Sequence, residues 1–319
     1  MVNSVVKTMK AIVCEKYGPP EVLKIAQREK PVPKNNEVLI KIYATSVTNS
    51  DIFIRSSEVS PQLIIPFRLM MGLTRPRNSI LGEVFSGVIE FAGSEVKRFS
   101  VGDKVYGLTG FSLGAYADYM CMRESDSKKG CLALKPNNIN FEEATSAAYG
   151  GLLAFQFLEK VKVARGHEVL IYGASGTSGT IAVQYAKHLG AVVTAVCGPS
   201  NLDFVKSLGA DRVLDYTKQE SIRCLGEYDV VFDTVGKRKT SDLKKAGMAA
   251  LKANGAYISI DDGVLLLESD RLNYITLLVE SGAIKPVNDR IYPFEQIVAA
   301  HRYVQMGHKR GNVAVTVNP

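Results

Sequence analysis

The sequence has little of what would take a protein into or across a membrane. No apolar run approaches the roughly 20 residues that a helix needs to cross a bilayer. The best candidate, residues 63–73, is interrupted by Arg68, and residues 1–10 lack the apolar core of a secretory signal. The five cysteines include no C-x-x-C pair, which is typical of proteins in a reducing compartment. We therefore expect a cytoplasmic protein with no membrane span.

Long runs of positive charge are also absent. The chain has 39 basic and 32 acidic residues, a formal net charge of +7, and the basic residues are spread along its length in short clusters such as residues 237–239. Proteins that bind nucleic acid gather basic residues on one surface, often with aromatic residues among them, so we expect no nucleic-acid partner. Attraction of an anionic small molecule explains a modest positive charge more simply.

The most informative segment is 169–179, where an apolar run ends in glycines spaced three apart, Gly173, Gly176 and Gly179. A helical pattern over 180–189 follows at once. Such a turn lets a pyrophosphate lie against the backbone at a helix N-terminus, where free N–H groups and the helix dipole favour negative charge. The spacing is not the G-x-G-x-x-G of the common fingerprint, so the following strand–helix pattern carries part of the argument. The segment predicts a dinucleotide site.

The character of the chain changes near residue 141. Before it, short β-rich runs are separated by Gly, Pro and Asn, and the irregular stretch 56–79 predicts a short helix that borders a cleft. After it, a helix over 141–163 precedes five strands, at 167–173, 191–197, 212–216, 228–233 and 255–260. This alternation predicts an α/β fold with a doubly wound parallel sheet.

The tail is expected to add one more strand–helix–strand unit. Its elements are predicted at 284–291, 294–306 and 312–317. The pattern leaves open whether this unit completes the parallel sheet or returns to the first domain.

Motifs along nearly the whole chain from Met9 fit one known family. Besides the glycine turn they are 18–23 (GPPEVL), 38–41 (VLIK), Asn49 with Asp51, 99–105 (FSVGDKV), 114–117 (GAYA), 208–211 (LGAD), 228–233 (YDVVFD) and 307–312 (GHKRGN). Together they resemble the medium-chain dehydrogenase/reductase superfamily, in its zinc-lacking quinone oxidoreductase branch. The resemblance implies a GroES-like β-barrel domain (1–140 and 286–319), a Rossmann domain (141–285), and a cleft between them that holds a nicotinamide. It also implies hydride transfer from NADPH to a quinone or an α,β-unsaturated carbonyl.

The residues that would bind zinc in this superfamily are missing. Zinc-dependent members use a Cys, a His beside a Glu, and a later Cys or Asp, but here 47–51 has no cysteine and the Gly-His-Glu segment becomes 81–84 (LGEV). There is no four-cysteine lobe for structural zinc. Ligands of a zinc site cluster, whereas the four histidines are scattered over different predicted elements: His167, His188, His301 and His308. We therefore predict no metal site and disfavour alcohol oxidation, which needs a Lewis acid here.

The end of the second strand of the parallel sheet favours NADPH over NADH. Enzymes that use NAD usually place Asp or Glu there to bind the ribose 2′-hydroxyl, whereas this strand ends in the neutral segment 197–201 (CGPSN). Ser200, Asn201 and the backbone of Gly198 can hydrogen-bond a 2′-phosphate, and the first two fit a helix N-cap equally well. The resemblance adds Tyr216, whose ring would cover the adenosine side. No arginine lies at this strand end, so positive charge would have to come from Lys206, Lys218 or Lys309.

On the nicotinamide side, the resemblance implies contacts at the carboxyl ends of the later strands. Asn49 would contact the ribose or the substrate. Gly236 with Val235 would approach the nicotinamide ring, and Ile258 with Ser259 would hold its carboxamide. The expected cofactor contacts are Asn49, Gly173, Ala174, Ser175, Gly176, Thr177, Ser178, Cys197, Gly198, Ser200, Asn201, Tyr216, Val235, Gly236, Ile258, Ser259 and Lys309.

For the chemistry itself the candidate residues are Asn49, Tyr116 and Tyr149. Either tyrosine could donate a hydrogen bond to a carbonyl, although a packed tyrosine is the simpler interpretation of each. Asp51 fits a helix-capping role better than that of an acid. A quinone can take its proton from water, so we assign no general acid from the sequence.

Two departures from the family pattern leave an alternative open. The segment 260–272 is shorter than the family usually has at this place. Because family members commonly use this region for the last sheet strand and for dimerisation, a homodimer is left open. At 151–154 (GLLA), Leu153 replaces a hydroxyl that could touch the nicotinamide. The alternative to a reductase is a nicotinamide-binding sensor or interaction protein without significant turnover.

Overall fold

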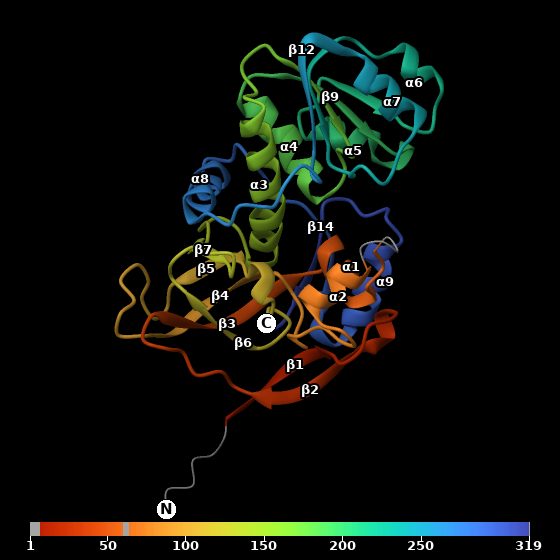
Figure 1. Cartoon of the computed structure of the whole chain (residues 1–319). Helices are drawn as coiled ribbons and strands as arrows, with labels where there is room; N and C mark the ends of the chain where they lie inside the picture. Colours follow the sequence, from red (N-terminus) through yellow and green to blue (C-terminus); the bar gives the residue numbers. More distant parts are fainter. Residues whose placement is uncertain (1–6, 60–63, 319) are drawn as a thin grey trace, which may run out of the picture.

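The computed structural model describes residues 7–59 and 64–318 and divides them between two sheets (Figure 1). Residues 1–6, 60–63 and 319 lie outside the described residues. The expectation that residues 1–10 form no secretory signal and the predictions for 56–79 therefore concern segments that the structure describes only in part. Helix α3 (Phe141–Lys160) stands between the two sheets and reaches both. Among the described residues, no helix is both long and apolar enough to cross a membrane.

The first sheet is built from both ends of the chain. For the residues described, its strand order is β13-β14-β3-β4-β5-β7, and β6 also pairs with β3. The strands are β3 (Glu37–Ser46), β4 (Val84–Ala92), β5 (Lys104–Leu108), β6 (Tyr119–Arg123), β7 (Cys131–Leu134), β13 (Asn288–Pro293) and β14 (Asn312–Thr316). β14 runs antiparallel to β3, with Ala314 opposite Ser46, and parallel to β13. The tail therefore returns to the first sheet and does not extend the parallel one.

A hairpin and three helices complete this half of the molecule. The hairpin is β1 (Thr8–Cys14) with β2 (Leu23–Glu29), and the helices α1 (Asn49–Ser56), α2 (Ile64–Met71) and α9 (Ile297–Gln305) lie near one another (Figure 1). The buried Arg55 of α1 links this helix to the hairpin and to α9, because its guanidinium donates to Gly18 O at 2.6 Å and to Gln305 Oε1 at 3.1 Å. α2 is the short helix that the sequence predicts within 56–79.

The second sheet is parallel, with strand order β10-β9-β8-β11-β12 in the part of the chain that is described. Its elements, in chain order, are β8 (Glu168–Tyr172), α4 (Thr177–His188), β9 (Val192–Cys197), α5 (Leu202–Ser207), β10 (Arg212–Asp215), α6 (Glu220–Arg223), β11 (Tyr228–Asp233), α7 (Asp242–Ala249) and β12 (Leu251–Ser259). All five predicted strands are present. β12 begins earlier than predicted because Leu251 already pairs with Tyr228, ahead of a bulge.

β12 is an edge strand of the parallel sheet. After Ser259 the chain passes through the short segment 260–268 into α8 (Ser269–Glu280), which packs on α3. No sixth strand follows β12 within the described residues, in agreement with the short segment seen in the sequence. Whether a second copy of the chain pairs at this edge stays a prediction.

Two glycines inside α3 allow close helix packing. A Cβ on Gly150 would lie 2.6 Å from the carbonyl oxygen of Thr177 at the start of α4, and one on Gly151 would lie 2.7 Å from Ile275 Cδ1 on α8. α3 itself begins with a capping box in which Asn140 and Glu143 bond each other's backbone N–H. These contacts fix the N-terminus of α4, where the site is predicted, against the helix that joins the two halves.

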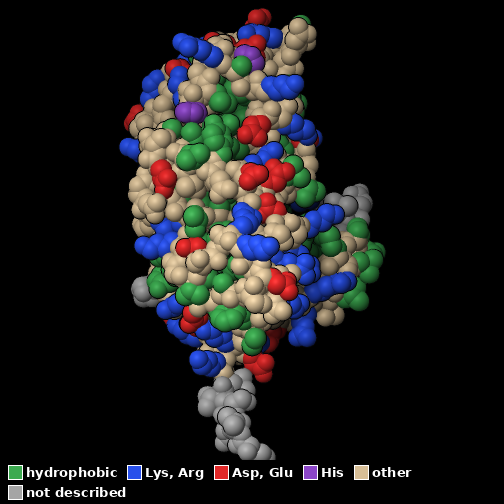
Figure 2. Space-filling model, turned by 90° about the vertical axis from the view of Figure 1, so that its left-hand side faces the viewer, with side chains coloured by type: hydrophobic (Ala, Val, Ile, Leu, Met, Phe, Trp, Pro, Cys, Tyr) green, Lys and Arg blue, Asp and Glu red, His purple; other side chains and the backbone are tan. Residues whose placement is uncertain are grey.

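The surface charge is mixed, as the sequence predicts. On the face shown in Figure 2, basic and acidic side chains are interspersed over both halves of the molecule. Four ion pairs among the described residues join two exposed side chains, and each of these pairs contributes little to stability. The pair between Lys244 and Asp233 is different, because both side chains are buried and their charged atoms lie 2.5 Å apart.

Replacing Gly150 with alanine should destabilise the protein. Alanine adds about 1 kcal/mol of helix propensity, but the new Cβ would meet a backbone oxygen that no side-chain rotation can move, so α3 and α4 must separate. We expect Gly150→Ala to lower the free energy of unfolding by about 1–2 kcal/mol, measured by urea denaturation. Gly226→Ala is the control, because its nearest neighbour is the end of the Arg212 side chain at 3.5 Å. Equal stability of the two variants would contradict the packing argument.

Candidate functional site

The glycine turn forms an uncapped helix N-terminus. Gly173 has φ +84°, and a Cβ on Gly179 would lie 2.2 Å from the carbonyl oxygen of Gly173, so both positions require glycine. The extended Gly176 is the N-cap, and α4 begins at Thr177 and not at residue 180. Within the described part of the chain, no side chain caps this first turn. These N–H groups and the helix dipole favour an anion at this end.

The C-terminal tail lies directly across this turn. Gly311 N–H donates to Ser175 O at 2.7 Å, and Thr177 Oγ1 donates to Gly311 O at 3.0 Å. Lys309 Nζ donates to Gly311 O at 2.7 Å and also contacts Thr177 Oγ1. Burial of the Lys309 ammonium group lowers its pKa to about 8. A cation beside the positive end of a helix is unfavourable by itself, so the arrangement suits an anion between them.

At the end of β9, the tail supplies an arginine that the sequence analysis did not assign. Arg310 Nε donates to Asn201 Oδ1 and its Nη2 donates to Ser200 O, each at 2.7 Å. The Tyr216 ring, at the end of the neighbouring strand, lies 3.5 Å from the position of a Cβ on Gly198. The four residues predicted for this side are therefore together, and a guanidinium lies among them.

The loop after β11 is held in place by the buried Asp233. Its Oδ1 accepts the N–H groups of Val235 at 3.0 Å and Gly236 at 3.2 Å, while Tyr257 donates to Oδ2 at 2.9 Å. Thr234 Oγ1 bonds the carbonyl oxygen of Gly173 at 2.9 Å, which ties the loop to the glycine turn. Ile258 and Ser259 end β12 at the same edge of the sheet. Val235 and Gly236 thus lie beside the turn, at the carboxyl ends of the strands, where open α/β sheets bind ligands.

On the barrel side, polar residues gather at the N-terminus of α1. Thr48 and Asp51 form a capping box, and Thr48 Oγ1 lies 2.8 Å from Asp51 Oδ2 and 3.0 Å from Glu83 Oε1. Tyr149 on α3 reaches the same group, with its hydroxyl 3.5 Å from Ser50 Oγ. Asp51 is fully buried, whereas Glu83 and Tyr149 are only partly buried. Desolvation raises the pKa values of both carboxyl groups, and the neighbouring Asp51 raises that of Glu83 further.

The candidate catalytic residues occupy different environments. Asn49 is exposed at the first position of α1 and Tyr149 is partly buried nearby. Tyr116 is fully buried in the barrel core, where its hydroxyl lies 3.3 Å from Ser46 O and 3.2 Å from His301 Nε2. Burial lowers the pKa of His301 to about 3, so this histidine is neutral. A hydroxyl with no exposed surface cannot donate to a bound substrate, so Tyr116 is buried too deeply to act as the donor.

Sequence reasoning missed two residues, Arg310 and Glu83. Arg310 is distant in sequence from β9, and the only available signal was its place in the 307–312 motif beside Lys309. Glu83 entered the sequence analysis only as part of segment 81–84, which was noted for its missing histidine, and nothing in the sequence brings Glu83 to Asp51. No three His, Cys, Asp or Glu side chains converge as a possible metal site among the residues described.

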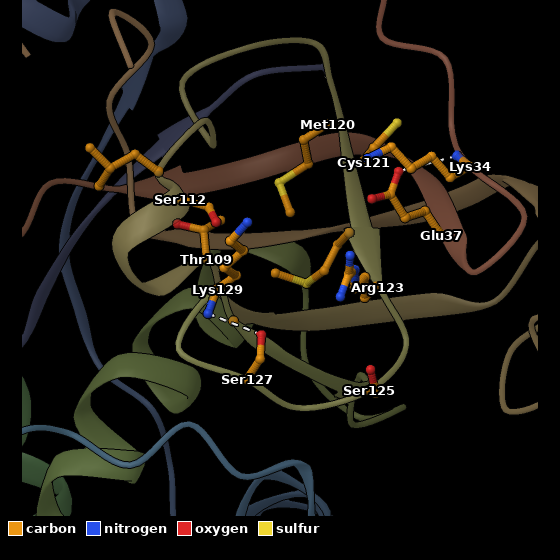
Figure 3. A pocket seen from close by; sticks show the side chains of 13 residues that line it. Lys34, Glu37, Thr109, Ser112, Met120, Cys121, Arg123, Ser125, Ser127 and Lys129 are labelled. Atoms are coloured by element: carbon orange, nitrogen blue, oxygen red, sulfur yellow. Dashed lines mark hydrogen bonds between the residues drawn. The ribbon is translucent and has the colours of Figure 1, made fainter. Parts of the chain in front are cut away.

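Two cavities among the described residues lie elsewhere. One of about 110 Å³ opens on the barrel (Figure 3), where Met120 points towards its middle and Lys34, Arg123 and Lys129 lie around it. A larger one of about 420 Å³ lies beside the end of α3, next to Gln156 and Val264. Neither is lined by a residue predicted for the site.

Comparisons with known proteins cover most of the chain. Residues 34–133 match the family described as alcohol dehydrogenase GroES-like domain, and residues 179–260 and 264–315 match two families described as zinc-binding dehydrogenase. The chain is 31% identical to the 2-methylene-furan-3-one reductase of Solanum lycopersicum and 31% identical to the chloroplastic NADPH-dependent alkenal/one oxidoreductase of Arabidopsis thaliana, over 98% of this chain and 80% of each relative. The solved structure of the quinone oxidoreductase from Coxiella burnetii matches with a TM-score of 0.85 at 28% identity, over 98% of this chain and 100% of that one.

The affinity of the helix N-terminus for a diphosphate should depend on the charge of Lys309. Its cationic form is lost as pH rises through about 8, so binding of inorganic pyrophosphate should weaken over that range. Lys309→Gln should bind about tenfold more weakly at neutral pH, the size of a charge-assisted hydrogen bond, and the ratio of the two affinities should approach one in alkali. Pyrophosphate also changes its protonation over this pH range, but that change affects both proteins equally and cancels in the ratio of their affinities.

Calorimetric titrations of both proteins measure this ratio. Lys24→Gln is the control, because Lys24 is exposed on β2, in the other half of the molecule. An affinity ratio that does not change with pH would contradict the role of Lys309.

Proposed function

The chain belongs to the medium-chain dehydrogenase/reductase superfamily, in its quinone oxidoreductase and alkenal reductase branch, and is an NAD(P)H-dependent oxidoreductase. From this premise we propose that it uses NADPH, without zinc, to reduce quinones or α,β-unsaturated carbonyl compounds. The observation that carries the proposal is the contact of Lys309 with the uncapped α4 N-terminus, together with the position of Arg310 at the end of β9.

The residues present fit the diphosphate of a dinucleotide. A Cβ at Gly173 would collide with Val235, and one at Gly179 would collide with Gly173 O, so only glycine permits the tight turn that leads into α4. Lys309 places a cation at a helix end that already favours an anion. NADPH supplies the hydride when bound; the chain's part is to orient it and to keep water away. The proposed contacts are those predicted from the sequence, with Arg310 added.

Arg310 is the basis for proposing NADPH over NADH. A guanidinium is suited to bind a phosphate with two parallel hydrogen bonds, and this one is held at the end of β9 by Asn201 and by the carbonyl of Ser200. No carboxylate lies in the segment 197–201 to repel a 2′-phosphate.

The substrate class is proposed from the relatives and from the polar side of the site. The names of these relatives specify an alkenal or enone, a methylene-furanone and a quinone, which are all conjugated carbonyl compounds. In this chain, Asn49 and Tyr149 offer an amide and a hydroxyl near the start of α1 that can hydrogen-bond a carbonyl oxygen. A donor aimed at the oxygen that gains charge stabilises the transition state.

We also propose a division into two domains. Residues 1–140 and 286–319 form a GroES-like domain, and residues 141–285 form a Rossmann domain. The return of β13 and β14 to the first sheet supports it.

The direct test is oxidation of NADPH, with NADH in parallel, against a panel of quinones and enones in the presence of a chelator. We expect turnover that prefers NADPH and is unaffected by the chelator. Clear NADPH binding with no turnover on any acceptor would instead favour the cofactor-binding sensor. Loss of activity with the chelator would refute the zinc-independent mechanism.

The preference for NADPH should depend on Arg310. Arg310→Gln should weaken NADPH binding about 10- to 100-fold, because a hydrogen bond to a charged group contributes about 1.5–3 kcal/mol, and should leave NADH binding nearly unchanged. Fluorescence titration of both cofactors measures the two dissociation constants. Arg302→Gln on α9 is a matched control, since Arg302 pairs with Glu21 at the surface. An equal loss for both cofactors would show that Arg310 has only a structural role.

A further inference from the structure

The two carboxyl groups at the start of α1 share a single hydroxyl. Thr48 Oγ1 lies 2.8 Å from Asp51 Oδ2 and 3.0 Å from Glu83 Oε1, and it also accepts the N–H of Asp51 at 3.1 Å. A threonine hydroxyl has one proton to donate, so it can serve only one of the two carboxylates. The other contact is a hydrogen bond only if that carboxyl group is protonated and donates to Thr48.

The backbone decides which carboxyl group carries the charge. Asp51 accepts N–H bonds from Thr48 at 2.9 Å and from Gly82 at 3.2 Å, and as the third residue of α1 it benefits from the helix dipole. The described structure gives the Glu83 carboxyl group no bond from a backbone N–H. Hydrogen bonds to a carboxylate favour its ionised form. Asp51 is therefore the anion, and Glu83 keeps its proton and donates it to Thr48.

The surroundings of Glu83 reinforce this assignment. The titratable groups that face it are Asp51 on α1, Tyr149 on α3 and Tyr116 before β6, with Arg55 behind Asp51 and Tyr116. Burial raises the pKa values of both tyrosines, so both are neutral. Desolvation and the Asp51 carboxylate raise the pKa of Glu83 well above its usual value.

Glu83 is also the accessible member of the pair. Asp51 is sealed in the interior, whereas Glu83 is partly exposed and lies at the end of α1 that carries Asn49, the expected contact of ribose or substrate. Tyr149, the remaining candidate for the carbonyl oxygen, belongs to the same cluster. An acid in this position can reach a group that the amide and the hydroxyl hold.

On the basis of the function proposed above, we propose that Glu83 is the proton donor of the reduction. The acceptor gains two electrons with the hydride and becomes an enolate or a hydroquinone anion. The O–H bond of Glu83 then breaks, its proton goes to the α-carbon or the oxygen of that anion, and the electron pair stays on the carboxylate. Two carboxylates beside one hydroxyl repel each other, so Glu83 recovers a proton from water, and each turnover consumes one proton.

The test compares Glu83→Gln and Glu83→Asp with the wild type. Glutamine keeps the shape but has no acidic proton, so kcat should fall roughly 10²- to 10⁴-fold, the usual contribution of general acid catalysis, while the dissociation constant of NADPH stays the same. Aspartate should restore part of the rate. Wild-type kcat should fall as pH rises through the raised pKa of Glu83, because the acid form is needed, and the glutamine variant should lose that dependence. Glu90→Gln is the matched control, because Glu90 lies on β4, the strand that begins directly after Glu83, and is exposed and paired with Lys30.

Infrared spectroscopy of the protein without cofactor gives a readout independent of turnover. The band of a protonated carboxyl group should be present at neutral pH in the wild type and in Glu90→Gln, and absent in Glu83→Gln. An ionised Glu83 at neutral pH, or unchanged kcat and pH profile in Glu83→Gln, would overturn the assignment while leaving the reductase intact. Absence of turnover in the wild type would remove the function and the donor role together.

Discussion

The contact of the tail with the glycine turn is the constraint on which the rest of the site depends. Gly311 N–H bonds Ser175 O, and from the next residue the chain enters β14, which pairs with β3. One short segment therefore fixes the parallel sheet relative to the barrel and carries Lys309 and Arg310 to the phosphate side. The position of the tail and its charge therefore come from neighbouring residues of one segment.

Two helix N-termini have opposite roles in this arrangement. That of α1 is closed by its own side chains, because Thr48 and Asp51 form a capping box that stabilises a buried carboxylate and leaves Glu83 neutral. That of α4 has glycine at the N-cap and no side-chain bond, so its N–H groups remain available to a ligand. α3 lies against the α4 end through Gly150 and reaches the α1 end through Tyr149, so two consecutive residues of one helix contact the two termini.

Local patterns predicted much of the fold, and long-range contacts account for what they missed. The glycine turn, the five parallel strands and the short segment after β12 are visible because each depends on neighbouring residues. The return of the tail, the place of Arg310 beside Asn201 and the pairing of Glu83 with Asp51 each join residues far apart in the chain. Helix α4 began earlier than predicted because an extended glycine, and not an apolar repeat, starts it. The burial of Tyr116 depends on packing that no motif records.

The position of the tail also governs what an incomplete chain can do. A growing polypeptide releases the whole parallel sheet before it releases residues 309–316, and domains tend to fold as they emerge. A chain interrupted before Gly311 would have the glycine turn but neither the barrel strand β14 nor the bond to Ser175 that sets the cations in place. Prematurely terminated products would therefore compete poorly for the coenzyme, and only fully synthesised molecules would draw on the cell's supply.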